Sequence, residues 1–145
     1  MRSETMVKKS YQRIFLSSKI STSSIISIYI LHLLAKSNEP MYGKEIARAI
    51  EDRTTRWDKY GKPTIHGYQV SRGILYGSLR ELEKRGLATG AWEQLDDQPT
   101  NKKTRYLYCI TDEGKEFLTH FKLQEKINLD NAIYIMEQIS NDITG

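Results

Sequence analysis

The stretch that decides the fold is SRGILYGSLRELEKRGL, residues 71–87. Three of its leucines recur at helical spacing, so they share one face that a protein core can bury. Those leucines are Leu75, Leu79 and Leu82. Ser71 stands where an N-cap residue is favoured, and Gly86 stands where a helix commonly ends. The stretch therefore predicts an amphipathic helix over about residues 71–86.

The opposite face of this predicted helix carries two glycines and two cations. It consists of Gly73, Gly77, Arg80 and Lys84, with Tyr76 on its flank. A solvated helix gains nothing from internal glycines, each of which costs about 1 kcal/mol against alanine. A helix whose backbone must press against another surface does gain from them. Because the cations favour a polyanion, we interpret the segment as a DNA recognition helix. A core position for Tyr76 and a solvated Arg80 are the alternatives.

The charge of the chain is unevenly distributed. Its 145 residues suit one domain with a real core, and the formal net charge is +4. Residues 1–111 hold 19 Lys and Arg against 11 Asp and Glu, whereas residues 112–145 hold 3 against 7. A basic body with an acidic end is typical of a nucleic-acid binder with a separate assembly segment. Ordinary unevenness of surface charge is the alternative.

The sequence gives little support to enzyme chemistry. The single cysteine, Cys109, excludes an intrachain disulfide and fits a cytoplasmic protein. The three histidines fall on different predicted elements, and Glu116 with His120 offers only two metal ligands. We therefore expect no catalytic residue, no metal and no cofactor. The apolar run at residues 25–35 is too short to span a bilayer, so we expect no membrane segment.

Two helices are predicted before the recognition helix. A basic N-terminal arm covers residues 1–22, and a serine cap at Ser23 or Ser24 starts a helix that runs to about Lys36. The second helix begins near residue 41 and places Ile46, Ile50 and Trp57 on one stripe. Its predicted end is the Tyr60-Gly61-Lys62-Pro63 segment, since glycine and proline commonly follow a helix.

Two strands are predicted after the recognition helix. Residues 87–94 and 104–111 are rich in β-formers and alternate in polarity, and residues 95–103 form a polar loop between them. Three helices followed by two strands with an exposed basic loop predict a winged helix-turn-helix domain over residues 23–111. The predicted fold class is mainly α with a small antiparallel β-wing.

The C-terminal segment, residues 112–145, is predicted to be helical and to mediate dimerisation. Acidic residues follow Thr111, where the helix dipole favours them, and Asn128 marks a predicted break. Beyond it, apolar residues repeat at intervals of three and four, which indicates a coiled-coil-like seam. Packing of the seam onto its own domain is the alternative to a second subunit. The predicted interface residues are Phe117, Phe121, Leu129, Ala132, Ile133, Met136 and Ile139.

The predicted DNA contacts combine phosphate binding with base reading. Phosphates would be bound by Lys44, Arg72, Lys102, Lys103 and Arg105, although a solvated loop is the alternative for Lys102 and Lys103. Bases would be read by Arg72, Tyr76 and Arg80. The full predicted set is Tyr42, Lys44, Ser71, Arg72, Gly73, Tyr76, Gly77, Arg80, Lys84, Lys102, Lys103 and Arg105.

Three patches of the sequence resemble the phenolic-acid regulator (PadR) family of winged-helix transcription factors. They are PMYGKEI at residues 40–46, GILYGSL and LEKRGL within residues 73–87, and YCITDEG at residues 108–114. The resemblance implies a homodimer that holds two recognition helices over successive half-sites of double-stranded DNA. It implies a repressor, and some such regulators release DNA when a small aromatic ligand binds.

The chain departs from that pattern at two places. Residues 51–70 are longer than is usual in the family and are basic. A long second helix before Gly-Lys-Pro also resembles the replication terminator proteins. The C-terminal segment has no tryptophan, which puts an aromatic ligand cavity in question. Replication termination, plasmid or viral DNA maintenance, and a protein-interaction module therefore stay open as alternatives.

Overall fold

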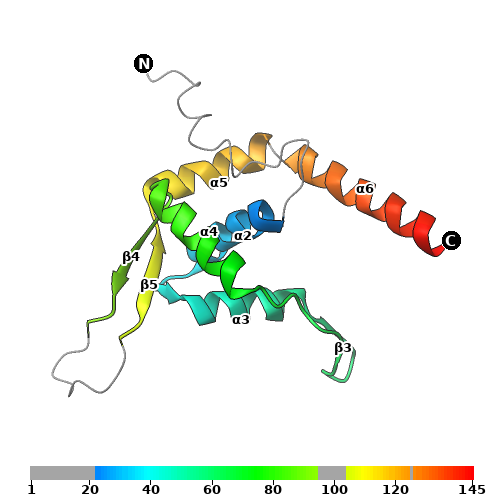
Figure 1. The fold of residues 1–145 in the computed structure, drawn as a ribbon, viewed down its shortest axis with the longest axis horizontal. Coiled ribbons are helices and arrows are strands. Elements are labelled where there is room, and N and C mark those ends of the chain that lie inside the picture. The colour runs from blue at the N-terminus through cyan, green and yellow to red at the C-terminus, as the bar shows by residue number, and fades with distance from the viewer. Residues whose placement is uncertain (1–21, 95–103, 125) are drawn as a thin grey trace.

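A computed structural model describes residues 22–94, 104–124 and 126–145 of the chain (Figure 1). The predicted arm therefore lies almost wholly outside the described residues, as does the predicted loop 95–103. In chain order the elements are α2 (Thr22–Lys36), β1 (Met41–Tyr42), α3 (Gly43–Thr54), β2 (Arg56–Trp57), β3 (Pro63–Ile65), α4 (Arg72–Lys84), β4 (Ala88–Trp92), β5 (Tyr106–Ile110), α5 (Asp112–Gln124) and α6 (Lys126–Thr144).

Helix α2 is the centre of the core. Ile30 and Leu31 have no exposed surface, and the helix packs against α3, α4, α5 and β5. Because neighbouring elements cover α2 on several sides, apolar residues are favoured on several of its faces. The three leucines predicted to face the core from α4 are buried, as the periodicity of that segment predicts.

The small sheet has three antiparallel strands in the order β1-β5-β4. The two strands of the predicted wing pair from Ala88 with Ile110 to Trp92 with Tyr106. The fold class, mainly α with an antiparallel β-wing, is thereby confirmed. Strand β1 was not predicted, because its two residues read as the start of a helix and become a strand only by pairing with β5.

The prediction for the second helix was wrong beyond Thr54. Helix α3 ends there, and the chain continues through an extended Thr55 into the β2–β3 hairpin. Gly61, predicted to cap the helix, instead adopts a φ of 77° in the hairpin turn, where glycine is favoured. Trp57 consequently leaves the apolar stripe of α3 and is 54% exposed.

The C-terminal segment consists of two helices, and the break between them lies before Lys126 rather than at Asn128, the predicted position. Helix α5 begins after Thr111, whose side-chain oxygen accepts a hydrogen bond from the backbone N–H of Gly114 at 3.0 Å. It ends at Gln124, and α6 begins two residues later, at Lys126. Figure 1 shows α5 lying across the body of the domain, whereas α6 extends away from it.

Candidate nucleic-acid interface

Helix α4 has the ends that the sequence predicts. The hydroxyl oxygen of Ser71 accepts a hydrogen bond from the backbone N–H of Ile74 at 3.2 Å, so Ser71 is the N-cap. At the other end, Gly86 has a φ of 75°, a conformation that residues other than glycine rarely adopt. The other N–H groups of the first turn, those of Arg72 and Gly73, have no acceptor within a helix and point out of its N-terminus, where anions are favoured.

The face of α4 opposite the core is open. A Cβ atom added at Gly73 or Gly77 would meet no atom within 4 Å. Arg72, Arg80 and Lys84 are exposed on the same helix, and among the described residues none of the three forms an ion pair. The backbone of α4 is therefore accessible between its cations.

The carboxylates of α4 are held by neighbouring side chains. Glu81 forms an ion pair with Arg85 at 2.8 Å, one turn further along the helix. Glu83 accepts a hydrogen bond from the hydroxyl of Tyr106 on β5 at 3.0 Å, and this bond raises the pKa of Tyr106. Both acidic side chains are half-buried, whereas the cations on the open face are not. The charges of α4 are thus sorted, with cations outward and carboxylates held by partners.

Tyr76 takes the alternative position that the sequence left open. Its ring packs against the core at the start of α3, where a Cβ at residue 43 would lie 2.5 Å from the Tyr76 hydroxyl oxygen. Glycine at position 43 therefore lets α3 and α4 approach closely. Tyr76 positions α4 on α3, which leaves little of its ring for reading bases.

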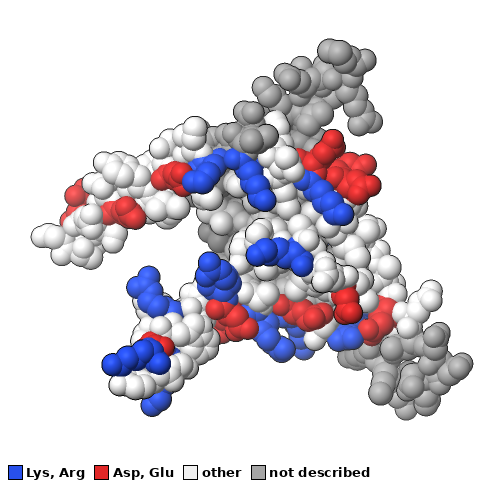
Figure 2. Space-filling view, turned by 180° about the vertical axis from the view of Figure 1, so that it is seen from behind, with Lys and Arg blue, Asp and Glu red and all other residues white. Residues whose placement is uncertain are grey.

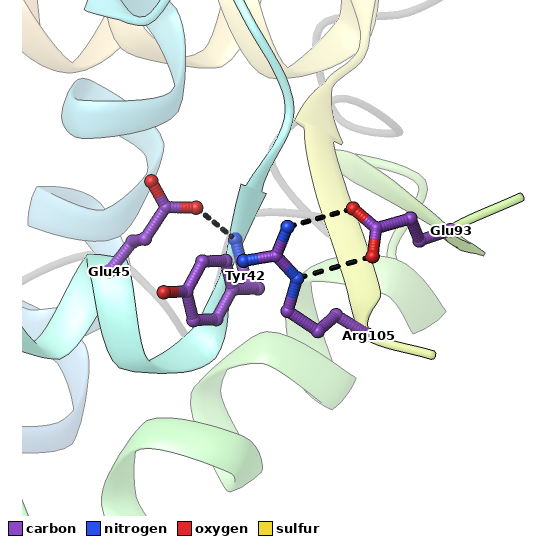
Figure 3. A network of polar contacts seen from close by, with 4 residues as sticks. All are labelled: Tyr42, Glu45, Glu93 and Arg105. Atoms are coloured by element: carbon purple, nitrogen blue, oxygen red, sulfur yellow. Dashed lines mark hydrogen bonds and ion pairs between the residues drawn. The ribbon is translucent and has the colours of Figure 1, made fainter. Parts of the chain in front are cut away.

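The predicted phosphate contact Arg105 already has partners within the chain. Figure 3 shows its guanidinium forked onto Glu93, with distances of 2.8 Å and 3.3 Å. The guanidinium also lies over the ring of Tyr42, 4.4 Å from its centroid. The backbone N–H of Tyr42 in turn donates to Glu45 at 3.2 Å, at the start of α3. Arg105 thus joins β4, β5 and the start of α3.

The electrostatics of this group fit a structural role. The hydrogen bond from Arg105 lowers the pKa of Glu93, so the carboxylate is ionised at neutral pH. Nearby on the sheet, burial raises the pKa of Tyr108 to about 12. Lys102 and Lys103 lie outside the described residues, whereas Lys44 is exposed on α3.

The β2–β3 hairpin, which gathers basic residues, was not predicted from the sequence. Figure 2 shows several Lys and Arg side chains around one projecting lobe of the molecule. Arg53, Arg56, Lys59 and Lys62 fall in or beside this hairpin, and all are exposed. The signals that could have revealed it are the β-formers Thr64 and Ile65 and the Asp58-to-Lys62 turn.

The predicted interface residues divide into two groups. The prediction for Phe117 was wrong, because this residue has no exposed surface and belongs to the core of its own protomer. Ala132 is also buried, and the half-buried Phe121 and Leu129 pack against the core. The second group is exposed on α6 and consists of Ile133, Met136 and Ile139. Of the predicted interface residues, those on the outer part of α6 are thus the ones exposed to a second subunit.

Two apolar cavities lie beside α2. One, of about 260 Å³, is lined by residues of α2, α5 and α6, including Tyr29, His32 and Phe121. The other, of about 520 Å³, opens between α2 and the end of α3. The His32 ring stacks on Tyr29 at 5.6 Å, and burial together with Lys36 and Lys122 lowers the pKa of His32.

Within residues 22–94, 104–124 and 126–145, no group of three His, Cys, Asp or Glu side chains is arranged to hold a metal ion. Over the same ranges, every helix is too short or too polar to cross a membrane.

The winged-helix arrangement and its family are supported by comparison with known proteins. Residues 30–120 match the family described as the transcriptional regulator PadR-like family. This match covers more than half of the chain, so the protein belongs to that family of DNA-binding transcriptional regulators. The family is one of regulators rather than enzymes, and it does not favour replication termination. No curated protein matches the sequence.

Solved structures share the fold. A protein of Thermoplasma acidophilum assigned as a transcriptional regulator is 24% identical, with a TM-score of 0.57 over 82% of this chain and 92% of its own. A PadR-like transcription factor of Bacteroides fragilis is 21% identical, with a TM-score of 0.55 over 78% and 91%.

Proposed function

We propose that this protein represses transcription by binding operator DNA as a homodimer, with α4 of each subunit in a major groove. The observation that carries the proposal is the open face of α4, which presents cations and two glycines. Its carboxylates are tied to neighbouring side chains, so a phosphate backbone meets little repulsion there. The free N–H groups behind Ser71 add a phosphate site at the helix start.

The roles of individual residues follow from their positions. Arg72 and Arg80 are exposed and can fork onto guanine, which is worth about 1–3 kcal/mol of discrimination per good contact. Lys84 and Lys44, both exposed, would bind phosphates. Arg105 acts indirectly, because its guanidinium fixes the base of the wing against α3.

The dimer contact would use the outer part of α6. Its exposed apolar side chains extend from the body of the domain, and burying apolar surface provides about 25 cal/mol per Å². Ile133, Met136 and Ile139 are central to this surface. A second copy of the same helix supplies a matching apolar partner.

An aromatic effector would fit the 260 Å³ cavity beside α2. Its lining is mostly apolar and carries two aromatic rings, Tyr29 and Phe121, near a single histidine. The cavity also touches Leu129 at the start of α6. A ligand there could alter how α6 packs, which links ligand binding to the spacing of the two recognition helices.

The decisive experiment measures specific binding of purified variants to DNA fragments selected from the genome by the wild-type protein. Arg80→Ala should weaken specific binding by about 1–3 kcal/mol without changing the melting temperature. Lys115→Ala, on exposed α5 surface, is the matched control for a lost charge. Unchanged affinity of the Arg80 variant would remove Arg80 from the interface.

A further inference from the structure

The β2–β3 hairpin exposes apolar and basic side chains together. Trp57 is 54% exposed, Tyr60 is 77% exposed and Ile65 is 52% exposed, although all three are large and apolar. Residues 53–66 also contain four Lys and Arg against one acidic residue, Asp58. The fold does not need these side chains in its core, so their combination points to a binding role.

The hairpin is built as a defined element. The Asp58 carboxylate accepts hydrogen bonds from the backbone N–H groups of Tyr60 at 2.8 Å and Lys62 at 2.9 Å. The hydroxyl of Thr64 donates to the carbonyl of Arg56 at 3.0 Å, across the two strands. The one acidic side chain is therefore used inside the turn, which leaves the basic side chains outside it.

The returning strand is fixed to the end of α3. The backbone N–H of Gly67 donates to the Thr55 hydroxyl at 3.0 Å, and that of Tyr68 donates to the Thr54 hydroxyl at 2.7 Å. A Cβ at Gly67 would clash with the backbone of Glu51, so the strand approaches α3 as closely as glycine allows. Little ordering is then required when the hairpin meets a partner.

The hairpin is joined to the start of α4 by a short connection. Figure 1 shows the chain running from β3 along the end of α3 and then into α4. Ile65 precedes Ser71 by six residues, so the two lie at most about 20 Å apart. Over that length a DNA duplex presents about 12 phosphates. A duplex that extends from the start of α4 toward the hairpin would therefore be within its reach.

We propose that the β2–β3 hairpin is a second DNA-binding element, which contacts the sugar-phosphate backbone beside the half-site bound by α4. Lys59 and Lys62 bind phosphates, while Trp57 and Tyr60 are covered by the duplex. The hairpin thereby lengthens the bound site on the side opposite the wing. This inference rests on the proposed function, because it requires α4 to hold the duplex.

The test is the salt dependence of operator binding by the full chain. Lys59→Ala with Lys62→Ala should lower the log–log slope by about 1.8, or 0.9 per lost phosphate contact. Between 50 and 200 mM salt, the variant should then lose about tenfold less affinity than the wild type. Lys59→Arg with Lys62→Arg should keep the wild-type slope. Lys36→Ala with Lys115→Ala removes the same charge elsewhere on the surface.

Tryptophan fluorescence provides a second readout. The chain has two tryptophans, so Trp92→Phe leaves Trp57 as the single tryptophan, which can be excited selectively at wavelengths where tyrosine does not absorb. Operator DNA should change its emission and protect it from a soluble quencher. A wild-type slope in the double alanine variant, or a Trp57 that operator DNA leaves unprotected, would overturn the hairpin proposal. The proposed function would still stand if Arg80→Ala weakens specific binding. Absence of salt-sensitive DNA binding by the wild type would overturn both.

Discussion

Replacing Gly77 by alanine should stabilise the fold and weaken DNA binding at the same time. Gly77 lies inside α4, where glycine costs about 0.5–1 kcal/mol against alanine. A Cβ there meets no atom within 4 Å, so the substitution causes no clash in the free protein. The free energy of unfolding should rise by about that amount, which corresponds to an increase in Tm of roughly 2–5 °C.

The opposite effect on binding follows from close approach of the α4 backbone to DNA. A methyl group forced into a well-packed contact typically costs about 1–3 kcal/mol, so Kd should rise about 5- to 150-fold. Thermal unfolding and a binding titration on the same preparation measure the two quantities. Gly114→Ala is the contrasting variant, because its Cβ would clash with the carbonyl oxygen of Leu87 and should lower Tm. A stabilised Gly77→Ala protein with wild-type Kd would refute the reasoning.

Three further predictions concern the wing, the cavity and the dimer. Glu93→Gln should lose the ion pair that holds Arg105, so DNA binding should weaken and hydrogen exchange in β5 should become faster, while Tm changes little. Hydrogen exchange at the wild-type rate would contradict this role of the ion pair. Because folding lowers the pKa of His32 below its usual 6.5, the free energy of unfolding should fall as the pH decreases through and below 6.5. His32→Gln should flatten that part of a plot of urea midpoint against pH, and an unchanged plot would contradict the role of His32. Ile139→Glu should shift the protein from dimer to monomer in light scattering, whereas Gln138→Glu, next to it but off the apolar seam, should not; a dimer in both would place the interface elsewhere.

The fold was predictable wherever a segment carries its own pattern. Leucines at helical spacing with Ser71 and Gly86 at the ends define α4, since caps and periodicity are local properties. The alternating strands of the wing follow for the same reason. The hairpin was missed because Gly61 and Pro63 are compatible with either a helix end or a turn. Only the pairing of β2 with β3 distinguishes the two.

The site was predictable in part. Exposure of Arg80 and Lys84 follows from their helical phase relative to the leucines of α4. Tyr76, however, flanks that face, and its burial depends on the glycine at position 43 of another helix. In the sequence Arg105 has no evident partner, because only the pairing of the strands brings Glu93 and Tyr42 beside it.

By itself, the amino-acid sequence determined that the chain forms an amphipathic helix at α4 followed by a two-stranded wing, because these depend on residues close together in the chain. Tertiary structure alone decided which charged and aromatic side chains remain accessible. Phe117 became core and Trp57 became surface because burial depends on what distant segments cover, a long-range property that local periodicity does not encode.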